Sequence, residues 1–363
     1  MLINRNGVYY EDIEYIWAQL TESEKNKLAG SKLLITGCAG FLGFYIMSFF
    51  HEYYEELKIQ KIVGVDNFLL GQPDWMVNIN NPVTEFVHMD ISNLSPTDVE
   101  ILQDSDYVIH MASIASPSYY RQHPVETVDA NVWGLRSLLE MFKSSENPRG
   151  FLFFSSSEVY GDPAVDRIPI SEEYCGNVRT IGPRACYDEA KRFGETICYI
   201  YTEKFGLPIT IARPFNNYGP GMKLNDSRVP ADFAKAVLLN EPIRIYSDGN
   251  PTRTYCYIAD AIAGYLKVLL YDSFDVFNIG IDRPEISVSR LATIYQEAGQ
   301  EIFDHKINIE YCVSEDAAYL IHNPARRCPD LSKARSILGF APSIGVETGV
   351  RRFLRFLQHQ GGF

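Results

Sequence analysis

Short apolar runs alternate with longer amphipathic stretches along the first two thirds of the chain. The apolar runs typical of buried strands are residues 33–36, 61–66, 86–89, 107–111, 151–155 and 208–212. The stretches whose apolar residues recur at helical spacing are 41–54, 129–142 and 187–204. Strands that alternate with helices indicate a parallel sheet covered by helices on both faces. We therefore predict an α/β fold with a Rossmann-like, doubly wound parallel sheet.

This pattern changes after about residue 215, where loops and prolines become more frequent. We predict a smaller, mixed α/β C-terminal substrate lobe, formed by residues 216–253 and 283–363. The segment 254–282 contains a helical stretch followed by an apolar run, so we expect it to return to the cofactor domain of residues 32–215.

The first 31 residues precede the first predicted strand and form an N-terminal extension. Four apolar residues in it, Ile13, Ile16, Trp17 and Leu20, fall at helical spacing. This spacing predicts a short amphipathic helix, for which packing against the rest of the chain is the simplest use.

Composition narrows the class of protein. The 363 residues are 46% hydrophobic, enough for one large core or two smaller ones. The formal net charge of −13 disfavours nucleic acid and anionic membranes as partners, because it repels phosphate. The start of the chain lacks the apolar core of a signal peptide, and no stretch of 18 apolar residues occurs. We expect a cytoplasmic protein that does not span a membrane.

Cysteine and histidine positions argue against disulfides and metals. The seven cysteines are an odd number, and no two stand at C-x-x-C spacing. The seven histidines include no H-x-x-x-H pair. We therefore predict neither a disulfide framework nor a metal site.

A glycine-rich turn indicates a dinucleotide site. Gly37, Gly40 and Gly43 stand between a predicted strand and a predicted helix. Glycine lets the backbone approach a pyrophosphate, which then lies at the helix N-terminus. Asp66 ends the next strand, where a carboxylate accepts hydrogen bonds from an adenosine ribose and repels a 2′-phosphate. The predicted cofactor is NAD rather than NADP.

Further candidate cofactor contacts follow the turn and the later strands. They are Phe41, Leu42, Asn67, Asp90, Ile91, Ala112, Tyr187 and Lys191. For Asp90, which we assign to the adenine, capping a helix is a competing interpretation.

Tyr187 and Lys191 form a Y-x-x-x-K motif at the start of a predicted helix. Residues four apart share a helix face, so the lysine charge is expected to lower the pKa of the phenol and produce a base. Ser156 follows the fifth strand, where its hydroxyl would bond the same substrate oxygen. Because the bare motif also occurs by chance on exposed helices, its value depends on this context.

The order Gly37–Gly43, Asp66, Ser156, Tyr187, Lys191 resembles the extended short-chain dehydrogenase/reductase family over about residues 32–358. Within it the chain is most similar to the UDP-glucuronate decarboxylases. The motifs that carry this resemblance are Ala115-Ser116-Pro117, His123-Pro124-Val125, residues 157–163, 181–189, 213–220 and 225–229, and Arg327-Cys328-Pro329-Asp330. Family dehydratases typically carry Asp-Glu where this chain has Ser157-Glu158, and sugar 4-epimerases usually lack the glutamate.

The resemblance implies an NAD-dependent decarboxylation of a nucleotide-linked uronic acid, catalysed by Tyr187, Lys191, Ser156, Ser157, Glu158 and Arg327. It also places Arg228, Arg253 and Arg327 toward the substrate, where the arginine fork suits phosphate and carboxylate. Arg327 would take the carboxylate, and Arg253 the phosphate with help from Asn216 and Tyr246. A homodimer is implied as well.

Three alternatives remain open at this point. The first is a 4-epimerase or dehydratase of the same family, and the second is a decarboxylase of a different nucleotide uronate. The third is a protein that binds NAD without catalysis, against which the intact Ser156, Tyr187 and Lys191 argue.

Overall fold

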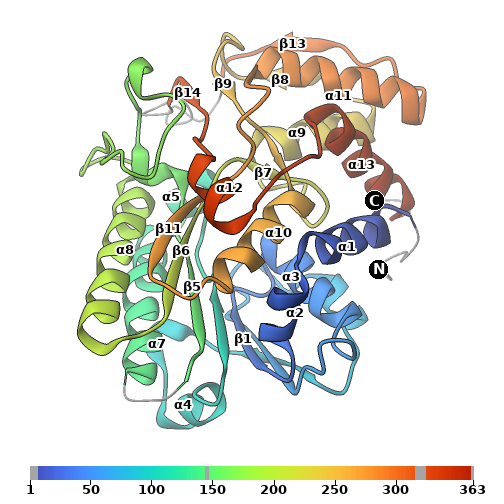
Figure 1. Cartoon of the computed structure of the whole chain (residues 1–363). Coiled ribbons are helices and arrows are strands. Elements are labelled where there is room, and N and C mark those ends of the chain that lie inside the picture. The colour runs from blue at the N-terminus through green and yellow to red at the C-terminus, as the bar shows by residue number, and fades with distance from the viewer. Residues whose placement is uncertain (1–6, 144–146, 315–323, 361–363) are drawn as a thin grey trace.

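The computed structural model describes residues 7–143, 147–314 and 324–360. A seven-stranded sheet with the order β11-β6-β5-β4-β1-β2-β3 forms its centre, and every neighbouring pair in it is parallel (Figure 1). Its strands are β1 (Lys32–Thr36), β2 (Lys61–Asp66), β3 (Thr84–His88), β4 (Tyr107–His110), β5 (Gly150–Phe154), β6 (Ile209–Pro214) and β11 (Asp275–Ile279). The prediction of a Rossmann-like parallel sheet is confirmed.

Alternation of side chains along each strand builds two cores, one on each face of the sheet. In β1, Leu33 and Ile35 belong to the larger core, whereas Leu34 between them belongs to the second. The larger core lies under α3 (Phe41–Glu52) and α10 (Ile258–Leu269), and the second lies under α7 (Leu135–Phe142) and α8 (Ala185–Phe205). Because successive strand residues point to opposite faces, continuous apolar runs are what a sheet covered on both sides requires.

Further helical segments lie between the strands of the central sheet along the chain. They are α4 (Pro96–Leu102), α5 (Pro117–Gln122), α6 (Pro124–Val128), a π-helical segment η3 (Asp129–Gly134), and the 3-10 turns η1 (Asp74–Asn78), η2 (Ile91–Asn93), η4 (Ser157–Tyr160) and η5 (Val165–Arg167). The predicted helix 129–142 is thus η3 followed by α7.

Helices and three small sheets form most of the C-terminal third. The helices are α9 (Val229–Leu239), α11 (Val288–Phe303), α12 (Ser332–Leu338) and α13 (Val346–His359). The sheets pair β7 (Asn217–Tyr218) with β10 (Cys256–Tyr257), β8 (Ile243–Ile245) with β13 (Ile309–Tyr311), and β9 (Thr252–Arg253) with both β12 (Ile286–Ser287) and β14 (Arg326–Arg327). The mixed α/β character predicted for this region is therefore present.

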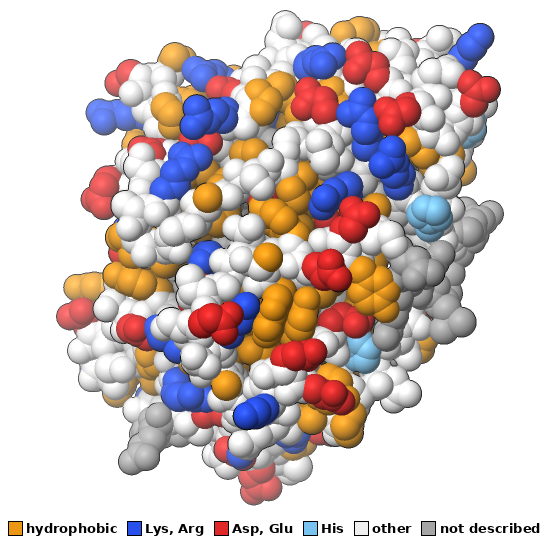
Figure 2. All heavy atoms as spheres, turned by 45° about the vertical axis from the view of Figure 1, so that its right-hand side comes forward, with side chains coloured by type: hydrophobic (Ala, Val, Ile, Leu, Met, Phe, Trp, Pro, Cys, Tyr) orange, Lys and Arg blue, Asp and Glu red, His pale blue; other side chains and the backbone are white. Residues whose placement is uncertain are grey.

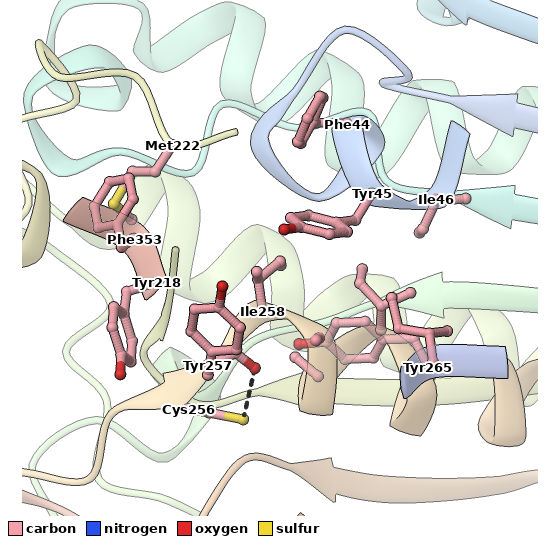
Figure 3. Packing of buried hydrophobic residues seen from close by; sticks show 14 of the residues in the cluster. Phe44, Tyr45, Ile46, Tyr218, Met222, Cys256, Tyr257, Ile258, Tyr265 and Phe353 are labelled. Atoms are coloured by element: carbon pink, nitrogen blue, oxygen red, sulfur yellow. Dashed lines mark hydrogen bonds between the residues drawn. The ribbon is translucent and has the colours of Figure 1, made fainter. Parts of the chain in front are cut away.

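The N-terminal extension forms α1 (Val8–Gln19) and α2 (Glu22–Leu28), which pack on the rest of the chain. Residues 1–6 of the predicted extension lie outside the described residues. The buried Asp12 accepts hydrogen bonds of 2.6 Å from Tyr45 on α3, Tyr257 on β10 and Arg352 on α13. Figure 3 shows the aromatic packing around Tyr45 and Tyr257. Burial raises the pKa of Asp12 to about 6 against these three partners. One carboxylate thus joins the extension to three later elements.

The surface carries charges of both signs, and the cysteines are reduced. Acidic and basic side chains are interspersed over the face seen in Figure 2. All seven cysteines are free thiols. In the part of the chain that the structure describes, no helix is both long and apolar enough to cross a membrane, and no group of three or more acidic, histidine or cysteine side chains could hold a metal ion.

Candidate active site

A cavity of about 1110 Å³ opens at the carboxyl ends of the central strands. The order of the sheet reverses between β1 and β4, which is where open parallel sheets bind their ligands. All the cofactor, catalytic and substrate residues predicted above line this one cavity. It exceeds the roughly 300–1,000 Å³ of typical small-molecule pockets. The cavity therefore has room for two ligands, or for one of unusual length.

The glycine-rich turn fits a dinucleotide because side chains cannot be accommodated there. Gly37 has φ +73°, and a Cβ on it would lie 2.6 Å from the backbone nitrogen of Ala112. A Cβ on Gly43 would lie 2.1 Å from the carbonyl oxygen of Cys38. Gly40 precedes the first turn of α3, whose N-terminal N–H groups face the cavity end of the turn. The backbone is thus open to a pyrophosphate at a helix N-terminus.

Asp66 ends β2 at the cavity wall, next to the glycine-rich turn. Its Oδ2 accepts from the backbone nitrogen of Ala39 at 3.0 Å, and its Oδ1 accepts from that of Phe68 at 2.9 Å. Burial raises the pKa of Asp66, and these two N–H groups oppose that shift. The carboxylate is held in place by the backbone while it faces the cavity, as binding of a ribose requires.

Asp90 serves as a helix cap, which was the competing interpretation from the sequence. Its Oδ1 accepts from the backbone nitrogen of Ser92 at 2.9 Å and from the Ser92 hydroxyl at 2.7 Å. Asp90 also lines the cavity beside Ile91. The adenine contact that we predicted for it stays a prediction.

Tyr187 and Lys191 lie one turn apart at the start of α8, and both are almost completely buried. Lys191 Nζ donates to the carbonyl oxygen of Phe154, the last residue of β5, at 2.6 Å. The same Nζ lies 5.7 Å from the centre of the Tyr187 ring. Tyr120 stacks on that ring, at 5.2 Å between centroids. The phenol is therefore held rigidly at the cavity.

The expectation that Lys191 lowers the pKa of Tyr187 is wrong for this structure. Burial raises the pKa of Tyr187 to about 12, and a hydrogen bond with Ser156 opposes the rise. Burial also lowers the pKa of Lys191 to about 7. Because desolvation penalises the charged form of both groups, it outweighs the charge effect that the spacing suggested.

Ser156 and Ser157 are positioned by the turn that follows β5. Ser156 Oγ accepts from the backbone nitrogen of Glu158 at 3.2 Å, which starts the 3-10 turn η4. Both serines are buried, and both line the cavity. The turn thus presents Ser156 beside Tyr187 and directs Glu158 toward the arginines described next.

Glu158 lies between two arginines. Arg327 Nη2 donates to Glu158 Oε2 at 2.9 Å, and Arg327 Nη1 donates to Oε1. Arg184 Nη2 also donates to Oε2. Although burial opposes ionisation, these two arginines lower the pKa of Glu158 to about 2. We call Glu158, Arg184 and Arg327 the cavity cluster.

Arg327, predicted to receive a substrate carboxylate, is thus paired with a carboxylate of the chain itself. Its side chain is 4% exposed, and its Nε has no hydrogen-bond partner among the described residues. An unpaired donor this deeply buried is costly, and a ligand oxygen would satisfy it.

The other predicted substrate arginines are held by different partners. Arg253 donates to the carbonyl oxygens of Thr252, Ala325 and Pro324, which fixes it to the backbone of β9 and of the segment before β14. Burial and the charge of Arg327 lower the pKa of Arg253 to about 10. Arg228 pairs with Asp226, its Nη2 lying 2.9 Å from Oδ2. The lining of the cavity includes six arginines, although the chain has a net charge of −13: Arg121, Arg184, Arg228, Arg244, Arg253 and Arg327.

Of the two uncharged substrate candidates, Asn216 has φ +43° and donates from Nδ2 to the carbonyl oxygen of Thr254 at 3.0 Å. Tyr246 directly follows β8 and also lines the cavity. Their contacts with a ligand stay predictions.

Three residues at the site were not assigned from the sequence: Tyr120, Arg184 and Asp188. Arg184 Nε lies 3.4 Å from Asp188 Oδ2, one turn along α8. Burial and the charge of Glu158 raise the pKa of Asp188 to about 7. The i, i+4 spacing of Arg184 and Asp188 is a signal that could have identified this pair.

The chain is similar to known proteins over most of its length. The family model described as "NAD dependent epimerase/dehydratase family" matches residues 33–280. The chain is 34% identical over 326 residues to UDP-glucuronic acid decarboxylase 1 of Arabidopsis thaliana, covering 89% of this chain and 69% of that protein. It is 33% identical over 348 residues to UDP-glucuronic acid decarboxylase 1 of Xenopus tropicalis, covering 93% and 75%.

Among solved structures, UDP-glucuronic acid 4-epimerase from Bacillus cereus in complex with NAD superimposes with a TM-score of 0.71 at 26% identity. The match covers 90% of this chain and 97% of that one.

Proposed function

Because the chain belongs to the NAD-dependent epimerase/dehydratase family, we propose that it removes carbon dioxide from a nucleotide-linked uronic acid, as in the conversion of UDP-glucuronate to UDP-xylose. That it is an NAD-dependent enzyme acting on a nucleotide sugar follows from the family and its relatives. The observation that carries the finer proposal is the cavity cluster, in which the buried guanidinium of Arg327 pairs with Glu158 in the same cavity as Tyr187.

The proposed reaction begins and ends at the C4 hydroxyl of the sugar. NAD⁺, when bound, accepts the hydride from C4 and later returns it. Tyr187 removes the hydroxyl proton, Ser156 orients that oxygen, and Lys191 holds the phenol in place from the next turn. Deprotonation of Tyr187 is costly while its pKa stands near 12, so bound cationic groups must favour the phenolate.

Decarboxylation follows from the ketone at C4, which makes the C6 carboxylate a β-keto acid. The C5–C6 bond breaks and carbon dioxide leaves. The electron pair of that bond stays on the sugar and forms an enolate over C5, C4 and the C4 oxygen. Arg327 binds the carboxylate before it leaves. Glu158, held ionised by its arginines, orients the water that returns a proton to C5. The C4 carbonyl is then reduced again, and Tyr187 gives its proton back.

Ser157 supports this choice over dehydration. In the family, dehydratases typically carry an aspartate at this position as the acid for a leaving hydroxyl. A buried serine cannot act as such an acid, whereas carbon dioxide needs none. Sugar 4-epimerases usually lack Glu158, which favours decarboxylation over epimerisation.

The test is to incubate the purified chain with UDP-glucuronate and NAD⁺ and to follow carbon dioxide and the nucleotide sugar by mass spectrometry. We expect carbon dioxide and a UDP-pentose in equal amounts. A C4-epimerised uronate without carbon dioxide would instead establish the 4-epimerase alternative. A panel of other nucleotide uronates would identify a different base or C2 substituent.

The Tyr187→Phe variant is the matched control. It keeps the ring and its stacking on Tyr120 but removes the phenolic proton carrier. We expect turnover to fall by at least about 100-fold with NAD binding intact. Turnover retained in this variant would contradict the assignment of Tyr187 as the base.

We further propose that the chain forms a homodimer through α8 and the helical segment before α7. Phe193 and Ile200 are two turns apart on α8 and 53% and 47% exposed, and Trp133 on η3 is 51% exposed. Such large exposed apolar side chains on neighbouring helices are typical of an interface. Light scattering should give twice the chain mass, and a Phe193→Asp variant should give the single mass.

A further inference from the structure

Arg184 has no part in the reaction as proposed, yet it shares Glu158 with Arg327. We propose that Arg184 is a positioning residue that holds Glu158 when Arg327 exchanges this carboxylate for the carboxylate of the substrate. This inference rests on the proposed function, since it requires a uronic acid as the substrate.

The geometry allows such an exchange of partners. Arg327 meets both oxygens of Glu158, whereas Arg184, at the N-cap of α8, meets only Oε2. Arg327 Nε is buried and has no partner in the described part of the chain, so its hydrogen bonding is incomplete in the present arrangement. Both arginines and Glu158 line the cavity, and each is within reach of a ligand there.

Charge balance explains why a second arginine is needed. If Arg327 alone paired with Glu158, moving it to the substrate would leave a buried carboxylate without a partner, which is strongly unfavourable. With Arg184 in place, each anion keeps one arginine after the exchange. The substrate carboxylate then enters without forcing Glu158 to take up a proton.

Asp188 makes Arg184 a fixed partner rather than a mobile one. It lies one turn further along α8, close to Arg184 Nε, and its Oδ1 has no hydrogen-bond partner among the described residues. The Arg184 side chain is only 11% exposed. Anchored on this side, Arg184 can turn its Nη2 to Glu158 but is held back from following the substrate.

The experiment measures the preference for a carboxylate, defined as the Kd of UDP-glucose divided by the Kd of UDP-glucuronate. Every protein carries Tyr187→Phe, so that no sugar is turned over, and is saturated with NAD⁺. Calorimetry gives both constants. Arg184→Met should lower the preference about tenfold, by weakening UDP-glucuronate and not UDP-glucose.

The matched control is Arg192→Met. Arg192 stands two turns after Arg184 on the same helix, and its Nη1 donates to the carbonyl oxygens of Val159 and Cys175. It supports the same turn as Glu158 without touching its carboxylate. The preference should stay unchanged in this variant, so a loss there equal to that of Arg184→Met would overturn the proposal.

A second arm separates exchange from direct binding of the sugar by Arg184. In a Glu158→Gln background there is no carboxylate to hold, so Arg184→Met should change the preference by less than about threefold. A tenfold loss that persists in this background would show that Arg184 contacts the uronate itself, and would overturn the proposal.

Two further outcomes are distinguished by the same data. If the Tyr187→Phe protein shows no preference for UDP-glucuronate, the proposed function is wrong. If it does prefer the uronate and Arg184→Met keeps that preference, only the exchange is wrong. Should Arg184→Met fail to fold, Arg184→Lys retains the charge but not the double contact, and should lose part of the preference.

Discussion

Two buried arginine–glutamate groups involve α8, one through Glu195 in the helix and one through Arg184 at its N-cap, and they differ in what surrounds them. In one, which we call the structural cluster, Glu195 pairs with Arg213, whose Nε and Nη2 donate to its two oxygens at 2.8 and 2.6 Å. Arg213 Nη1 donates to the hydroxyl of Tyr160 at 2.7 Å. The other is the cavity cluster, where Glu158 is shared by Arg184 and Arg327.

The two arginine–glutamate clusters differ in role because only the cavity cluster lines the cavity. In the described part of the chain, Glu195 and Arg213 do not line the cavity, whereas all three members of the cavity cluster do. Every nitrogen of the Arg213 guanidinium has a partner, but Arg327 Nε has none among the described residues. A saturated pair fixes the fold, and an incompletely bonded pair beside a cavity is available to a ligand.

The largest expected effect is on the stability of the structural cluster. Arg213→Met leaves the carboxylate of Glu195 buried without its charged partner, which should cost about 3–5 kcal/mol of unfolding free energy. Urea unfolding measures this loss. Arg192→Met removes hydrogen bonds to backbone carbonyls and a solvent-exposed ion pair with Glu189, and should cost about 1–2 kcal/mol. If both variants lost the same amount, the ion pair would not be the main support of this region.

A pH-dependent effect should distinguish the cavity cluster. The pKa of Glu158 is lowered from 4.5 to about 2, so its ionised form stabilises the fold. This contribution is fully present above pH 4.5 and is lost as the pH falls through about 2. The ionised carboxylate of Glu158 thus contributes about 3 kcal/mol to the unfolding free energy.

The measurement compares the chain with its Glu158→Gln variant by urea unfolding over this pH range. Both proteins carry Asp188→Asn, because the raised pKa of Asp188 would otherwise add its own pH dependence. The difference in unfolding free energy should shrink toward zero as the pH falls to about 2. A difference that stays constant with pH would contradict the lowered pKa of Glu158.

The turnover number kcat should respond differently to substitution of Glu158 and of Glu195. Glu158→Gln keeps the shape of the side chain but removes the charge that orients groups at C5, so kcat should fall about 100-fold. Glu195→Gln should reduce the folded fraction while each folded molecule keeps kcat within about threefold. Steady-state assays corrected for folded protein by circular dichroism measure both. Equal losses in the two variants would remove the distinction between the clusters.

The sequence allowed the sheet, the glycine-rich turn and the cavity residues to be predicted, because these depend on local pattern. Apolar runs of four to six residues mark strands buried on both faces, and Gly37 and Gly43 leave a recognisable spacing. The cavity cluster was different. Its members, Glu158, Arg184 and Arg327, are far apart in the chain and meet only after β14 packs against the turn beyond β5.

The pKa shifts that depend on burial could not be predicted from the sequence either. The spacing of Tyr187 and Lys191 suggested a lowered phenol pKa, but how strongly both groups are desolvated is decided by the whole fold. Asp12 gave no signal either, since a single acidic residue on an amphipathic helix usually faces water. Its hydrogen bonds to Tyr45, Tyr257 and Arg352 show why the extension is part of the fold.

The smallest expected effect tests whether the structural cluster is as saturated as its geometry indicates. The hydroxyl of Tyr160 accepts from Arg213 and donates to Asn278 Oδ1 at 2.7 Å, in a fully buried position. Tyr160→Phe leaves both partners in place with one hydrogen bond fewer each, which should cost about 1–2 kcal/mol of stability. Urea unfolding and a kcat measurement on the same preparation give the answer. Because Tyr160 is separated from the cavity, kcat should not change, and a fall in kcat without a loss of stability would mean that the two clusters act as one network.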